Sequence, residues 1–182
     1  MNQSIYSEMM VHVPLCTNKN PQNVLVVSND AKSLINEIAK HTDIKATVVN
    51  ASLDALRDSE DNSFDVLICE MKNLDVASLA HISRTLKDDG QIVINHPALD
   101  KIEENKSLMQ ILANYFKIIM PYNLGNGSTA LLASKEYHPT ADIILQRSDM
   151  LDNLNVYNCE IHIAAFAMPN YIRKEYLGII KN

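Results

Sequence analysis

Short runs of aliphatic and β-branched residues alternate along the chain with stretches in which apolar residues recur every three or four positions. A run of four to six apolar residues is typical of a strand buried on both faces, whereas the wider spacing predicts an amphipathic helix. We therefore predict strands over residues 24–27, 46–49, 64–69 and 91–95. Helices are predicted over residues 31–41, 52–57, 75–90 and 100–115, the third of them ending on Gly90 as its C-cap.

The pattern changes in the last third of the chain. Two further strands are predicted at residues 117–120 and 129–133, and the linker at residues 123–127 is too short to hold a helix. Parallel neighbours need a dozen or more connecting residues, so these strands should form an antiparallel hairpin. Alternating strands and helices closed by such a hairpin predict the α/β class: a three-layer αβα sandwich with a mostly parallel sheet, forming one domain over residues 1–182.

Composition narrows the class of protein. A net charge of −6 argues against nucleic acid as a partner, and no apolar run approaches the ~20 residues that span a bilayer. The first residues lack the basic and apolar segments of a signal peptide. The cysteines at 16, 69 and 159 give neither a paired framework nor the spacing of a metal site. We expect a cytoplasmic, reduced protein with no metal, no membrane partner and no nucleic-acid partner.

Sheets of this class bind ligands at the carboxyl ends of their strands, which indicates where chemistry should be sought. The first strand is followed by Ser28, Asn29 and Asp30, where a nucleotide-binding protein usually has a glycine-rich turn. Ser28 and Asp30 are candidates for contact with a cofactor, and equally for an ordinary helix cap. Asn50 follows the second strand and could hydrogen-bond an adenine edge or a hydroxyl, or serve only as a turn residue.

The third strand is followed by two carboxylates, Glu70 and Asp75. Together they could bind a cationic amine and accept its proton, so both are candidate catalytic residues. Asp75 is equally well explained as the N-cap of the next helix. Glu70 stands just past a strand end, where a carboxylate is harder to explain by packing than Asp75 is by capping.

Several segments, in order along the chain, resemble one enzyme family. Tyr6-Ser7-Glu8-Met9, followed by His12-Val13-Pro14-Leu15, is similar to the Tyr-(His/Gln)-Glu-Met and His-Val-Pro-Leu motifs that open the catalytic domain of spermidine synthases. Phe64-Asp65-Val66-Leu67-Ile68 resembles the Tyr-Asp-Val-Ile-Ile strand of that family. The segments 122–135 and 157–169 resemble its penultimate hairpin and its closing His-Arg-Ala-Ala-Phe-x-Leu-Pro stretch. The chain is thereby identified as a member of the family.

The resemblance implies a Rossmann-like fold of the S-adenosylmethionine-dependent methyltransferase type. It implies aminopropyl transfer from decarboxylated S-adenosylmethionine, a co-substrate, to putrescine, with no prosthetic group and no metal. The partners would be a polyamine and a nucleoside substrate, and a homodimer is an open expectation. Tyr6, Glu8 and Tyr157 are the preserved residues that could contact substrate, although each has a structural interpretation too. Family members usually carry an N-terminal β-rich domain, so we expect a truncated start or a reduced form.

The chain departs from the family where the chemistry should be. The segment 28–33 replaces the glycine-rich cofactor loop. The family has two strands between that loop and the Tyr-Asp-Val-Ile-Ile strand, and only one fits here. If it is the first, Val49 takes the place of the ribose-binding acid; if it is the second, Asn50 stands at the adenine-binding aspartate. In the catalytic loop, Glu70 keeps one carboxylate, Asn73 replaces the catalytic aspartate, and Lys72 adds a positive charge.

Three interpretations follow from this mixture of matches and losses. The first is a divergent aminopropyltransferase of weak activity, in which Glu70 and Asp75 handle the amine. The second is an inactive relative that serves as a binding or interaction module. The third is a small S-adenosylmethionine-dependent methyltransferase, indicated by the segments 61–66 and 82–90.

Overall fold

A computed structural model describes residues 2–182, with side chains described from residue 4 onward. Its centre is a six-stranded sheet of order β2-β1-β3-β4-β6-β5, in which β1 to β4 run parallel and β6 runs antiparallel to both of its neighbours. The strands are β1 (Asn23–Val27), β2 (Lys45–Val49), β3 (Phe64–Cys69), β4 (Leu86–His96), β5 (Ile118–Asn123) and β6 (Thr129–Ser134). The predicted antiparallel hairpin is confirmed.

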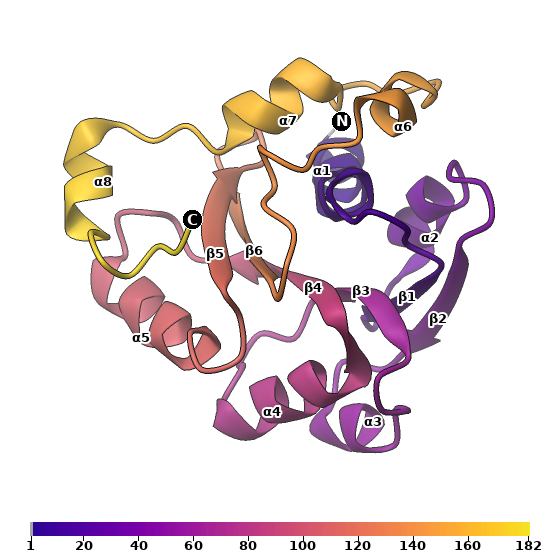
Figure 1. The fold of residues 1–182 in the computed structure, drawn as a ribbon, viewed down its shortest axis with the longest axis horizontal. Helices are drawn as coiled ribbons and strands as arrows, with labels where there is room; N and C mark the ends of the chain where they lie inside the picture. The colour runs from indigo at the N-terminus through magenta and orange to yellow at the C-terminus, as the bar shows by residue number, and fades with distance from the viewer. Residues whose placement is uncertain (1) are drawn as a thin grey trace.

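Helices cover both faces of the sheet (Figure 1). One face carries α1 (Asn2–Thr17), α2 (Lys32–Ile38), α6 (Leu145–Asp149) and α7 (Cys159–Ala165). The other carries α3 (Leu53–Arg57), α4 (Val76–Thr85), α5 (Ile102–Leu112) and α8 (Asn170–Glu175). The predicted three-layer αβα arrangement is therefore confirmed. Among the described residues, no helix combines the length and apolarity needed to cross a membrane.

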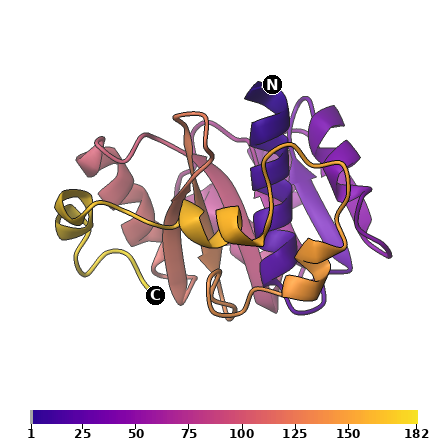
Figure 2. The same cartoon turned by 90° about the horizontal axis from the view of Figure 1, so that it is seen from above.

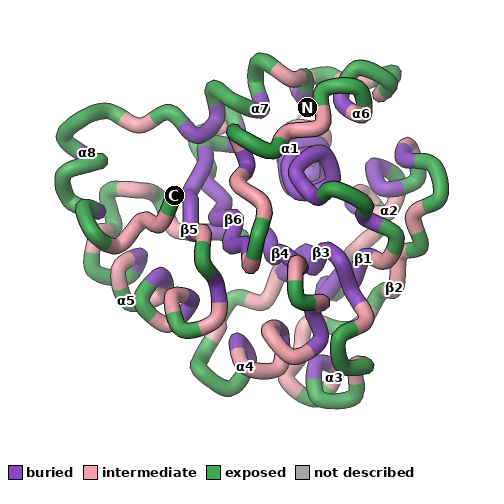
Figure 3. Tube along the Cα trace, in the orientation of Figure 1, coloured by how far each residue is buried: buried purple, intermediate pink, exposed green. Residues whose placement is uncertain are grey.

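The hydrophobic pattern did not predict the long helix α1, nor the short helices α6, α7 and α8. The helix α1 lies lengthwise over the sheet (Figure 2), and its middle and last turns are buried on all sides (Figure 3). A helix covered all round shows no apolar stripe for a periodicity argument to detect. Pro14 lies inside it and brings no backbone N–H, while its carbonyl accepts hydrogen bonds from Asn18 and from the side chain of Gln91 in β4.

Glu8 fastens the C-terminal part of the chain across α1. Its carboxylate accepts hydrogen bonds from the consecutive backbone amides of Asn155, Val156 and Tyr157, at 2.8 to 3.1 Å. Burial opposes ionisation of this fully covered side chain, but the three amides and the Ser4 hydroxyl lower its pKa to about 2. Glu8 is therefore an ionised clamp between segments that lie almost 150 residues apart in the sequence.

A second buried polar chain joins α1 to α2. His12 places its Nδ1 2.9 Å from Nε2 of His41 and its Nε2 2.9 Å from the carboxylate of Glu37. Lys40 reaches the same carboxylate at 2.8 Å. Burial opposes the charge on Glu37, yet the hydrogen bonds from His12 and Lys40 hold its pKa below the ordinary value. Burial, and the nearby His12, lower the pKa of His41 to about 3.

The predicted end of the helix α4 on Gly90 is wrong. The helix ends at Thr85 and the chain enters β4 at Leu86, so that Gly90 lies within the strand. Its φ is not in the left-handed region that a glycine C-cap uses. A Cβ atom at this position would lie 2.9 Å from Cβ of Leu86 and 3.0 Å from the carbonyl oxygen of Lys87. Glycine, which has no Cβ atom, therefore fits at this irregular stretch of the strand without displacing Leu86 or Lys87.

The Gly90→Ala variant should therefore be less stable than the parent, by about 1–3 kcal/mol, because the new methyl group forces Leu86 and the strand backbone apart. Urea unfolding followed by circular dichroism measures the difference. Ser107→Ala, on the exposed side of α5, is the control and should change the stability little. An unchanged midpoint for Gly90→Ala would contradict the crowding.

The protein should also lose stability as the pH falls from 6.5 toward 4. Burial lowers the pKa of His96 and His162 to about 4 and that of His41 to about 3. Unfolded histidines titrate near pH 6.5, so in this window the unfolded chain binds more protons than the folded one. Each histidine can contribute a slope of up to about 1.4 kcal/mol per pH unit. Urea midpoints that stay level between pH 7 and pH 5 would contradict this prediction.

Candidate functional site

The carboxyl ends of β1 and β3 meet at the middle of the sheet and bring two predicted residues together. Val27 pairs with Cys69 in the parallel ladder, and the next residues are Ser28 and Glu70. The Ser28 hydroxyl donates a hydrogen bond to the carboxylate of Glu70. The backbone amide of Glu70 donates to the Val27 carbonyl at 2.9 Å, which extends the strand pairing into the site. Glu70 is thus held on a rigid strand end, as a binding carboxylate requires.

Tyr6 reaches the same carboxylate from the N-terminal half of α1. Its phenol hydrogen-bonds Glu70, and burial together with the charge of Glu70 raises the pKa of Tyr6 well above its ordinary range. The tyrosine therefore stays a neutral hydrogen-bond donor at any working pH. Of the residues that the sequence singled out, Tyr6, Ser28 and Glu70 form one cluster.

A pocket of about 280 Å³ opens beside this cluster, between the segments that follow β3 and β4. Glu70 lines it together with residues that the sequence analysis did not single out as ligand contacts: Met71, Asn95, His96, Pro97 and Lys101, with Lys72 at the same rim. Lys72 and Lys101 are exposed, and Asn95 is exposed as well. The carboxyl end of β4 was predicted as a strand end, so the rule that located the other candidates could have pointed to Asn95 and His96.

His96 is the most unusual polar residue of this pocket. It is the last residue of β4 and only 5% exposed, yet neither of its ring nitrogens has a hydrogen-bond partner among the described residues. Burial lowers its pKa to about 4, against a smaller opposing effect of the Pro97 carbonyl. Its backbone is fixed, because the Thr129 hydroxyl lies 3.1 Å from the His96 carbonyl oxygen and 2.9 Å from that of Pro97.

The turn after β1 satisfies its own backbone. The amide of Ser28 donates to the Val49 carbonyl at 3.0 Å, and that of Asp30 donates to the Ser28 hydroxyl at 3.0 Å. Asn29 reaches across to accept from the amide of Ala51 at 3.0 Å. These contacts give Ser28 and Asp30 the bonding of an ordinary turn, and contact with a cofactor stays a prediction for both.

The position of β2 decides between the two alternatives for the single strand of the middle region. It pairs directly with β1, so it is the strand that follows the first turn, and Val49 stands where an acid would be expected to bind a ribose. Asn50 is exposed just beyond it. A hydrogen bond from Asn50 to a nucleoside stays a prediction, and a carboxylate is missing from this strand end.

Asp75 serves as the N-cap of α4. Its carboxylate accepts from the Ser78 amide at 2.8 Å and from the Ser78 hydroxyl at 2.7 Å, and both bonds lower its pKa. It does not line the pocket that holds Glu70. These contacts match the capping interpretation, and no contact links Asp75 to the reaction, so its catalytic role stays a prediction.

Glu8 and Tyr157 lie together but apart from the pocket lining. Glu8 binds the backbone amide of Tyr157, and the Tyr157 hydroxyl lies 2.8 Å from Nδ1 of His162. Tyr157 is only 3% exposed. Both side chains are engaged in holding the C-terminal segment, which matches their structural interpretation, and substrate contact stays a prediction for both.

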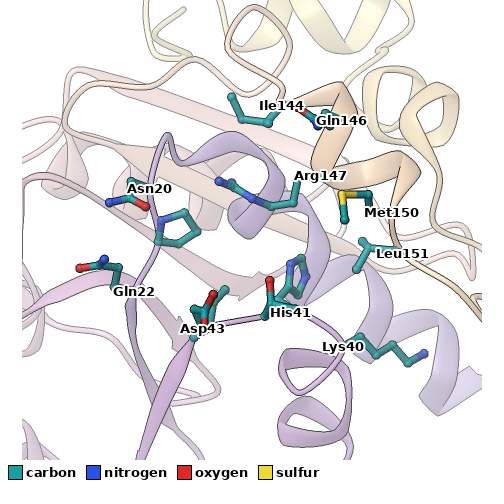
Figure 4. A pocket seen from close by; sticks show the side chains of 13 residues that line it. Asn20, Gln22, Lys40, His41, Asp43, Ile144, Gln146, Arg147, Met150 and Leu151 are labelled. Carbon is teal, nitrogen blue, oxygen red and sulfur yellow. The ribbon is translucent and has the colours of Figure 1, made fainter.

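A larger cavity, of about 430 Å³, lies at the opposite end of the strands (Figure 4). Its walls come from the segments before β1 and β2 and from α6, and they include His41 and Arg147. Arg147 donates to the carbonyls of Leu15, Asn18 and Lys19, so its guanidinium caps the end of α1. We place the functional site in the smaller pocket, because ligands of parallel sheets bind at the carboxyl ends of the strands.

Comparison with known proteins finds relatives similar in sequence and solved structures similar in fold. Residues 3–57 match the family model of the spermine/spermidine synthase domain. A polyamine aminopropyltransferase of Helicobacter acinonychis is 27% identical over 201 residues, which cover 93% of this chain and 76% of that protein. The crystal structure of spermidine synthase from Thermotoga maritima matches with a TM-score of 0.81 at 23% identity, over 94% of this chain and 74% of that one. A crystal structure of spermidine synthase in complex with the transition state analogue AdoDATO also matches with a TM-score of 0.81. It is 22% identical, and the match covers 94% of this chain and 75% of that one. These likenesses confirm the Rossmann-like, methyltransferase-type fold.

The capping role of Asp75 can be tested with two substitutions. Asp75→Ser keeps an N-cap oxygen without a carboxylate and should leave the thermal midpoint nearly unchanged. Asp75→Ala removes the cap and should lower the midpoint by a few degrees, measured by circular dichroism. Equal midpoints for the serine and alanine variants would contradict the capping role.

Proposed function

We propose that the chain belongs to the spermidine synthase (polyamine aminopropyltransferase) family, which it resembles along most of its length, and that it transfers an aminopropyl group from decarboxylated S-adenosylmethionine to putrescine. The products are spermidine and methylthioadenosine. The reacting carbon is attached to a sulfonium, which is already a good leaving group. The protein therefore has three tasks: to bind the diamine, to orient one amine in line with the carbon–sulfur bond, and to remove that amine's extra proton.

The observation that carries this proposal is the position of Glu70. Its carboxylate stands at the carboxyl end of a central strand, on the rim of the pocket, and is steadied by hydrogen bonds from Ser28 and Tyr6. A carboxylate with two fixed donors is oriented before any ligand arrives, and its remaining lone pairs suit a primary ammonium group. Charge-assisted hydrogen bonds of this kind are among the stronger ones in proteins.

A second function from another class has its own supporting observation. The turn after β1 satisfies its own amides, β2 ends without an acid, and Asn73 is exposed in place of a catalytic aspartate. A relative that binds a polyamine or nucleoside without transferring anything would need none of these groups. A small methyltransferase would need the same nucleoside contacts as the transferase, so it gains nothing over the first proposal.

Release of methylthioadenosine tests the proposal directly. Purified protein with decarboxylated S-adenosylmethionine should release it only when putrescine is present, and mass spectrometry should find spermidine in equal amount. Glu70→Gln keeps the size and loses the charge, so kcat/KM for putrescine should fall about 10- to 100-fold. Glu103→Gln, the same substitution at an exposed position of α5 outside the pocket, is the matched control and should stay within threefold of the parent.

Two results would contradict the proposal in different ways. No amine-dependent product at high protein concentration, with putrescine still binding by calorimetry, would favour the binding module. If the parent is active and the Glu70→Gln variant is equally active, the proposed transfer reaction stands but the role of Glu70 in it is contradicted.

A further inference from the structure

We propose that His96 contacts the acceptor amine and takes the proton that this amine must lose before it attacks. The inference rests on the proposed function and goes beyond it. It assigns the proton acceptor to a residue outside the segment that corresponds to the family's catalytic loop. The motivating observation is a covered imidazole without partners, on the wall of the pocket that also holds Glu70.

The other groups that could accept the proton are already in use. Asp75 is bonded twice to Ser78, away from the pocket. Asn73 carries an amide and has no basic site at neutral pH. The carboxylate of Glu70 accepts hydrogen bonds from Ser28 and Tyr6, and we assign its negative charge to binding the ammonium group. Lys72 and Lys101 at the rim of the pocket are cations and can only donate.

His96 has the properties that a proton acceptor needs. A neutral imidazole has one nitrogen that accepts and one that donates, and neither nitrogen of His96 has a hydrogen-bond partner in the described part of the chain. Leaving such groups unpaired in a buried position is costly, so a ligand that supplies the missing hydrogen bond gains that free energy. Burial lowers the pKa of His96 to about 4, so the ring is neutral and by itself a weak base, and the Glu70 carboxylate on the same pocket would favour the imidazolium that forms. The strand pairing of β4 with β6 fixes its backbone.

The pocket walls explain how the amine would reach the ring. Tyr176 and Asn105 bind the carbonyls of Leu99 and Ala98, at 2.7 and 3.0 Å, and so hold the wall that follows β4. The ring nitrogens are covered, and Met71 and Lys72 line the same pocket. We expect the incoming diamine to uncover the ring, since catalytic hydrogen bonds often form only in the substrate complex.

The proposed step balances without a further reactant. One ammonium nitrogen of putrescine gives a proton to the free nitrogen of His96, which becomes an imidazolium. The lone pair released on the amine forms a bond to the carbon attached to sulfur. The carbon–sulfur bond breaks, its electron pair returns to sulfur, and the sulfonium becomes the neutral thioether of methylthioadenosine. The charge lost at sulfur is carried away as the proton on His96, which solvent then removes.

The first test compares the parent, His96→Gln and His81→Gln in the methylthioadenosine assay. Glutamine preserves size and hydrogen bonding without a basic site, so kcat of His96→Gln should fall about 100-fold or more, with KM for putrescine within a fewfold. Added imidazole should restore part of the rate, because a small base can enter the space of the missing ring. His81 lies on α4 outside the pocket, and its glutamine variant should keep the parental rate.

The second test does not require turnover. Putrescine added to protein with ¹⁵N-labelled histidines should shift the ring signals of His96, assigned by their loss in His96→Gln, and leave those of His81 in place. Parental turnover with a His96→Gln variant that stays within threefold would overturn the role of His96 while the proposed function stands. A loss of rate that imidazole does not restore, with His96 signals unmoved by putrescine, would also overturn it. No turnover and no shift would overturn both proposals.

Discussion

Three consecutive backbone amides bind the carboxylate of Glu8, and this clamp draws the C-terminal segment over α1. With the sheet on one side and that segment on the other, the helix is buried nearly all round. A helix without an apolar stripe is stabilised only when every side is covered, so α1 depends both on the sheet and on the C-terminal segment. The same helix delivers Tyr6 to the site, which makes the site depend on the clamp.

The polar groups inside the molecule divide into two kinds. Glu8, Glu37, His12 and Tyr157 have their hydrogen bonds supplied by the protein, and their cost of burial is offset by those bonds. The ring nitrogens of His96 have no such bonds from the residues that the structure describes. This contrast separates groups that hold the fold together from a group whose partner is expected to come from outside.

The architecture could be predicted because it follows from short local signals. Six strands, their parallel and antiparallel sense, and the αβα layering come from the lengths of apolar runs and linkers, and the strand bounds agree to within a few residues. The exceptions were the helices α1, α6, α7 and α8, which were not predicted, and the end of α4. Gly90 has the chemistry of a C-cap, but its role is to avoid the Leu86 side chain and the Lys87 carbonyl, which only the folded strand brings near.

The sequence alone determined the fold class, the resemblance to one enzyme family and the place of Glu70 at a strand end, because each depends on residues close together in the chain. Only the tertiary structure decided which contacts each side chain makes. It assigned Asp75 to a helix cap and Glu8 to a clamp, and it placed His96 beside Glu70. The physical reason is that hydrogen-bond partners and burial come from segments far apart in sequence, so the same residue types can be structural or chemical until the chain has folded.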